Sequence, residues 1–217
     1  MGDIFQEVDD DIRQARLLRL WARYGRYLII ILVGTVLATA GKVGWDEFQT
    51  RRMIAESARF SGALKLIESG QHDQAALFFN LLADESVTGY GQLAALRQAA
   101  ALTEGGEPNE AIAVYDRLAG SANTDPIIAE LASVLAAMRL LDQGLSQEAV
   151  TKLKQISDGR GPWKHLAKEV TALSIMQTGD IEKGRNLLES LANDPSVPAG
   201  IRSRSGKILA TNHGNLH

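Results

Sequence analysis

The sequence contains no cysteine and only four histidines, and both shortages exclude functions. A chain without thiols has no disulfide framework, no thiolate metal site, no cysteine nucleophile and no acylated cysteine of the lipoprotein type. The four histidines are scattered and form no HExxH pair, and neither GxSxG nor GxxxxGK[ST] occurs. We therefore expect no catalytic site, no metal site and no cofactor.

Basic residues are not in excess. The 217 residues hold 23 Lys plus Arg against 26 Asp plus Glu. Six of the basic and five of the acidic residues precede Asp46, so the remainder of the chain is mildly acidic, at −4. A nucleic-acid-binding domain shows a basic face, and nucleic acid is therefore not expected as a partner.

One long run without charge is present, from Tyr27 to Gly41, and Trp21 and Trp45 flank it. Lys42, at its far end, has a stem long enough to carry its ammonium to the headgroups. A helix of about 24 residues rises roughly 36 Å, which is enough to cross a bilayer. Five arginines precede the run, at 13, 16, 19, 23 and 26, whereas the other flank mixes signs. The positive-inside rule then predicts a cytoplasmic arm at 1–26, a transmembrane signal anchor at 27–45 and an exported domain at 46–217.

Two features of this run have alternative interpretations. Ala38-Thr39-Ala40 fits a signal-peptide cleavage site, so cleavage after Ala40 is the alternative to an anchor; the long, Asp-containing leader and the apolar character up to Trp45 favour the anchor. Gly34, Ala38 and Gly41 recur at helical spacing and are candidates for contact with another transmembrane helix. The alternative is that they are ordinary small residues of a helix that faces lipid.

Beyond Trp45 the apolar residues follow helical periodicity, broken at regular intervals by glycine. Four segments align on a glycine followed five residues later by a small residue, at spacings of 36, 38 and 35. Other positions also fall in register, such as the small residues seven places before each glycine. The glycines and small residues are Gly70 with Ala75, Gly106 with Ala111, Gly144 with Ala149, and Gly179 with Gly184.

These repeats resemble the tetratricopeptide repeat, a pair of antiparallel helices of about 34 residues with small side chains where the two helices cross. Helices that cross roughly 8 Å apart tolerate only Ala or Gly at the crossing. The match departs early in each first helix, where a bulky aromatic is often found and this chain has Arg59, Ala95, Ser133 and Lys168. The sequence therefore predicts an all-α protein: one N-terminal transmembrane helix, then an α-solenoid of about four tetratricopeptide-like pairs and a C-terminal capping helix.

The proline and glycine separators place the helices of this solenoid. The predicted pairs are 46–69 with 72–84, 89–104 with 107–120, 126–143 with 146–157, and 162–178 with 180–193, and the capping helix is 199–210.

The first helix of each pair lines the concave side of such a stack, which suits peptides and unfolded segments. In the predicted register this face includes five apolar residues, and if they are exposed they favour a hydrophobic client. The alternative is that they pack against the next repeat or the capping helix. The five are Phe60, Leu64, Leu96, Met138 and Met176.

From about residue 12 onwards the chain resembles the YfgM-like family of bacterial inner-membrane proteins, which are ancillary subunits of the Sec translocon. The resemblance lies in the basic tail, the span ending in GKVGW with Phe48 after it, and the segments TGYGQLAALRQAA and GRGPWKHLAKEVTALSIMQTGDIEKGRNLLE. The acidic arm at Asp9, Asp10 and Asp11 departs from the pattern. The resemblance implies a periplasmic repeat domain on a signal anchor, associated with the translocon and with periplasmic chaperones or exported proteins.

Together these observations predict a non-enzymatic, single-pass inner-membrane adaptor whose repeats hold chaperones or emerging clients beside the translocon. The anchor would make weak contacts useful by raising the effective concentration of the bound protein. The alternative is a structural scaffold for envelope assembly or cell division, with folded protein partners. The sequence does not predict the oligomeric state.

Overall fold

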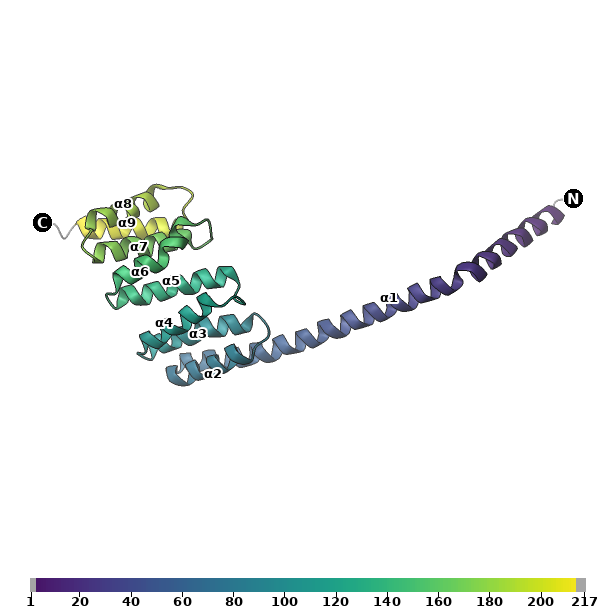
Figure 1. Cartoon of the computed structure of the whole chain (residues 1–217), viewed down its shortest axis with the longest axis horizontal. Coiled ribbons are helices and arrows are strands. Elements are labelled where there is room, and N and C mark those ends of the chain that lie inside the picture. The colour runs from purple at the N-terminus through teal and green to yellow at the C-terminus, as the bar shows by residue number, and fades with distance from the viewer. Residues whose placement is uncertain (1–2, 214–217) are drawn as a thin grey trace. The chain divides into compact units, whose positions relative to one another are not determined.

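The computed structural model describes the backbone of residues 3–213 and the side chains of residues 21–211 (Figure 1). These residues form helices and no strands, so the fold is all-α. The chain divides into two compact units, Met1–Ile54 and Ala55–His217. The helices are α1 (Asp3–Glu68), α2 (His72–Glu85), α3 (Tyr90–Glu104), α4 (Pro108–Gly120), α5 (Pro126–Asp142), α6 (Ser146–Asp158), α7 (Lys164–Gln177), α8 (Ile181–Asn193) and α9 (Ala199–His213).

The first unit consists of helix α1 up to Ile54, and it holds the long apolar run. Within the described side chains α1 is the one helix that is long and apolar enough to cross a membrane. Aromatic and arginine side chains pair at both ends of the run: the Arg26 guanidinium lies 5.3 Å from the centre of the Tyr27 ring, and that of Arg52 lies 4.4 Å from the Phe48 ring. Tyrosine and tryptophan are enriched at the interfaces of a bilayer. The side chains of Asp9, Asp10 and Asp11 lie outside the described residues.

Each helix pair of the second unit turns at a glycine in the left-handed region. Gly70, Gly106, Gly144 and Gly179 have φ angles of +75°, +87°, +79° and +102°. In the first turn the Gly70 amide donates to Ile67 O at 2.9 Å and the Gln71 amide donates to Leu66 O at 2.8 Å. Glycine adopts a positive φ without a Cβ clash, so these turns satisfy the carbonyls that the end of a helix leaves free.

The two helices of each pair cross where the side chains are smallest. Ala75, Ala111 and Ala149 are 0% exposed, and Gly184 is buried. A Cβ at Gly184 would lie 2.7 Å from Ala172 O and would overlap the Met176 side chain. The fourth pair therefore crosses too closely even for alanine.

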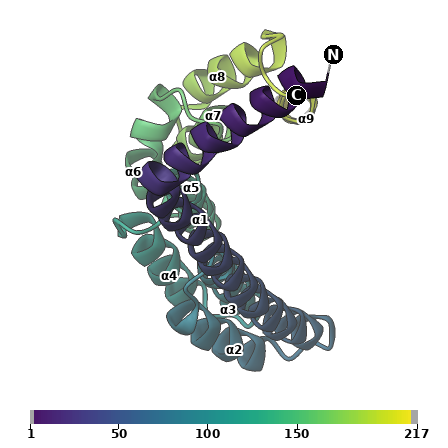
Figure 2. The same ribbon diagram turned by 90° about the vertical axis from the view of Figure 1, so that its right-hand side faces the viewer.

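The pairs follow one another along an arc, with α4, α6 and α8 on its outer edge and α3, α5 and α7 inside (Figure 2). Besides consecutive helices, α5 contacts α7 and α7 contacts α9. The first helices of the third and fourth pairs thus lie close enough to touch, and α9 lies against α7 as a further first helix would. They form the inner surface of the stack, as expected for a solenoid of helix pairs.

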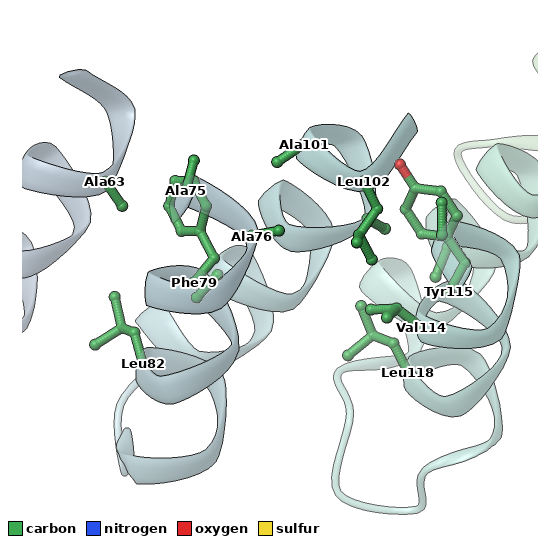
Figure 3. Close-up of a cluster of buried hydrophobic side chains, with 14 of the residues drawn as sticks. Ala63, Ala75, Ala76, Phe79, Leu82, Ala101, Leu102, Val114, Tyr115 and Leu118 are labelled. Carbon is green, nitrogen blue, oxygen red and sulfur yellow. The ribbon is translucent and has the colours of Figure 1, made fainter. Parts of the chain in front are cut away.

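Large apolar side chains fill the space between helices on either side of the crossings. Phe79 and Leu82 of α2 lie next to Ala63 of α1, and Leu102 of α3 points toward α4 (Figure 3). The Phe60 and Phe79 rings meet edge to face with their centroids 5.3 Å apart. Burial of one such side chain contributes about 1.5–3 kcal/mol, so the core is the main source of stability.

Helix α9 covers the open end of the stack and is held there by a buried charge. Glu169 of α7 is 2% exposed, and its carboxylate accepts hydrogen bonds from Arg204 Nε at 2.6 Å and from Arg204 Nη2. The same carboxylate raises the pKa of Arg204 through a hydrogen bond. A buried carboxylate is tolerated only when it is paired, so this contact fixes the position of α9 on α7.

The helix boundaries lie within two residues of the predicted ones, apart from the start of the helix predicted at 46–69 and the C-terminal end of the capping helix, which extends to His213. The described part of the predicted arm at 1–26, the predicted anchor at 27–45 and the predicted helix at 46–69 all belong to one helix, α1. Helix α7 begins at Lys164 rather than at 162, because Pro162 and Trp163 form a turn before it. The Trp163 indole donates to Ile127 O at 2.8 Å and so ties this turn to the start of α5.

Candidate protein-binding surfaces

The five apolar residues singled out from the sequence lie on the first helices of the pairs, and each of them is half-buried. Phe60, Leu64 and Leu96 pack against the core of the first two pairs, and Met138 packs against that of the third and fourth. Met176 lies over Gly184, whose missing side chain leaves room for it. Each side chain therefore supports the core with one part and faces outward with the rest, and a role in binding stays a prediction.

Cationic side chains lie on two of the same helices, α3 and α5. Arg97 of α3 is exposed, and Arg139 of α5 pairs with Asp142 at 3.2 Å. Burial raises the pKa of the Tyr115 hydroxyl of α4, while the nearby Arg139 and Arg97 guanidiniums lower it by less. Helices α3 and α5 thus carry both partly exposed apolar residues and positive charge, a mixture that suits an extended peptide better than a small apolar ligand.

A polar cavity of about 470 Å³ lies between α2, α3 and α4. Its amide side chains mostly bind each other or the backbone: Gln98 donates to Asn80 at 3.1 Å, and Gln92 donates to Asn123 O at 3.3 Å. Satisfied amides of this kind join one repeat to the next. We therefore regard this cavity as part of the scaffold.

In the second unit, an exposed apolar ridge lies on α2. Leu77, Phe78 and Leu81 are 59%, 54% and 47% exposed, and Phe78 and Leu81 line a groove of about 680 Å³ between α2 and the end of α1. Sequence reasoning missed this groove. The signal was present, because Phe79 and Leu82 already fill the core positions of this helix and its other large apolar residues are therefore surplus.

The small residues of the apolar run face outward on α1. Gly34, Ala38 and Gly41 are exposed, and a Cβ added to either glycine would meet nothing within 4 Å. Thr35 and Thr39, on a neighbouring strip, donate to the carbonyls of Ile31 and Thr35 at 2.8 Å. The glycine strip could therefore accept a closely approaching helix, and its contact with one stays a prediction.

Clusters of histidine and carboxylate side chains are possible metal sites in a protein. Among the described side chains no group of three or more His, Asp or Glu could hold a metal ion. His72, which starts α2, has its Nδ1 3.1 Å from the carboxylate of Glu104, the last residue of α3. This contact joins two repeats at the surface.

Comparison with known proteins adds one match. Residues 19–193 match the family described as "Tetratricopeptide repeat-like domain". The match includes the apolar run and all four helix pairs but not α9. No curated protein and no solved structure matches the chain.

Proposed function

Because the chain belongs to the tetratricopeptide repeat-like domain family, whose repeats typically bind other proteins, we propose that it is a membrane-anchored protein-binding adaptor. The observation that supports this proposal is that the inner helices α3 and α5 carry partly exposed apolar residues, Leu96 and Met138, each followed in the sequence by an arginine. In this proposal the repeats bind a protein partner and the apolar run of α1 holds that partner at a membrane.

The finer assignment is an adaptor ancillary to the Sec translocon in a bacterial inner membrane. Residues 1–26 are then cytoplasmic, and the repeats face the periplasm, where they hold chaperones or emerging exported proteins. The arginines before the apolar run and the family resemblance support this orientation and these partners. Tethering at the membrane raises the local concentration of the repeats, so contacts of low affinity give useful occupancy.

The proposal is tested by affinity purification of the full-length chain from detergent-solubilised inner membranes, followed by mass spectrometry. Translocon subunits, periplasmic chaperones or secreted proteins should co-purify. The variant Met138→Glu/Met176→Glu should lose the chaperones or secreted proteins, provided that its circular dichroism matches the wild type. Recovery of folded envelope or division proteins alone would favour the scaffold alternative and reject the translocon assignment.

A further inference from the structure

The groove on the first helix pair is an unfilled position in the repeat stack. Gly62 and Leu66 of α1 form one wall, and Phe78 and Leu81 of α2 form the other. Ala63 and Leu82, at the left of Figure 3, are 3% exposed and form its floor. The Arg59 guanidinium and the Glu85 carboxylate, 2.8 Å apart, close one end. The groove is therefore apolar along its length and charged at its end.

The later repeats show what fits such a groove. Phe78 corresponds to Val114 of the second pair, which is 5% exposed. Gly62 corresponds to Gln98, which donates to Asn80 of α2 at 3.1 Å. In the second pair this face is thus covered by α2, the last helix of the pair before it. An α-helix has the shape that would complete the groove of the first pair.

The charge of the domain indicates what kind of helix would bind in this groove. Residues 55–149 hold 13 acidic and five basic residues, whereas residues 150–213 hold six acidic and ten basic ones. The half of the solenoid that contains the groove therefore carries a net −8 and attracts cations. A second copy that docked groove to groove would bring two such acidic halves together, which the charge opposes.

We propose that the groove between α1 and α2 binds an amphipathic α-helix of a partner protein that carries lysine or arginine beside its apolar stripe. The apolar stripe covers Phe78 and Leu81, and the basic residues face the acidic half of the domain. This surface lies on the end of the stack, apart from the five inner residues, so it can hold one partner while the inner surface holds another. If the groove binds no such helix, the proposed adaptor function of the inner surface is unaffected.

The test uses the full-length chain in phosphatidylcholine nanodiscs, with empty nanodiscs as the blank. The probe is a fluorescent 18-residue helical peptide with a Leu/Ala stripe and lysine at the other positions, and binding is measured by fluorescence anisotropy. A matched peptide has glutamate in place of lysine. We expect the lysine peptide to bind, the glutamate peptide to bind at least about tenfold more weakly, and the affinity for the lysine peptide to fall as salt rises.

Variants locate the site of binding. The double variant Phe78→Ser/Leu81→Ser should bind the lysine peptide about tenfold more weakly or worse, because it lacks the two apolar anchors of the groove. Both residues are exposed, so folding should be preserved, and circular dichroism checks this. Ile181→Ser changes a residue that is 44% exposed at the far end of the stack and should leave binding unchanged.

Any of four outcomes would overturn the proposal. One is no binding of the lysine peptide to the wild type, and another is equal binding of the two peptides. The third is equal binding to the wild type and to the Phe78→Ser/Leu81→Ser variant. Self-association that strengthens with salt and is lost in this variant, without peptide binding, would assign the groove to a second copy and would also reject the proposal.

Discussion

Removal of Arg204 should loosen the end of the solenoid by leaving a charge buried without its partner. Glu169 is 2% exposed and has both carboxylate oxygens bonded to the Arg204 guanidinium. Breaking a buried pair from one side costs about 3–5 kcal/mol. The Arg204 side chain is itself 54% exposed, so water can partly replace it, and we expect Arg204→Met to cost about 3 kcal/mol.

The matched control replaces both partners. Glu169→Met/Arg204→Met leaves no buried charge and keeps a similar volume, so its stability should lie within about 1 kcal/mol of the wild type. The assay is urea unfolding of the full-length chain in dodecyl maltoside, followed by circular dichroism at 222 nm, with equal slopes as the condition for comparing midpoints. Equal midpoints for the wild type and Arg204→Met, or a double variant less stable than Arg204→Met, would refute the reasoning.

Three further predictions use the same unfolding assay. Gly184→Ala should cost about 1–3 kcal/mol because its Cβ would meet the backbone at Ala172, whereas Gly206→Ala, which meets nothing within 4 Å, should be neutral or stabilising; equal effects would contradict the close crossing. Phe79→Ala should cost about 3–5 kcal/mol, whereas Phe78→Ala, one residue away and 54% exposed, should cost less than about 1 kcal/mol; a reversed order would mean that the register of α2 is wrong. Trp163→Phe should cost about 1 kcal/mol by removing the hydrogen bond to Ile127 O, and an unchanged midpoint would show that this bond adds nothing.

The helices were predictable because each carries its own local signal. A glycine that must take a positive φ ends the first helix of each pair, and a small residue five places later marks the crossing. Both requirements involve residues that lie within a few positions of one another, so they can be recognised in the sequence alone. The boundaries of α2 and α8, for example, follow from Gly70 and Gly179 together with the apolar periodicity.

The rest could not be predicted because it depends on contacts between distant residues. Glu169 and Arg204 are 35 positions apart, and on the sequence each resembles a charge of a solvated helix face. Periodicity placed Met138 and Met176 on the inner surface but could not decide how deeply the neighbouring repeat covers them. The groove beside Phe78 exists because no repeat precedes the first pair, so it is a property of the end of the stack.

Site-specific photocrosslinking in living cells tests the central claim, that the inner surface of the repeats binds protein. A photoreactive amino acid is placed at Leu96 or at Met138, and at Lys154 on the outer helix α6, whose side chain is 78% exposed, as the control. The account predicts crosslinks to protein partners from the two inner positions and few or none from Lys154. Crosslinks of equal yield from all three positions, or none from the inner ones, would contradict it.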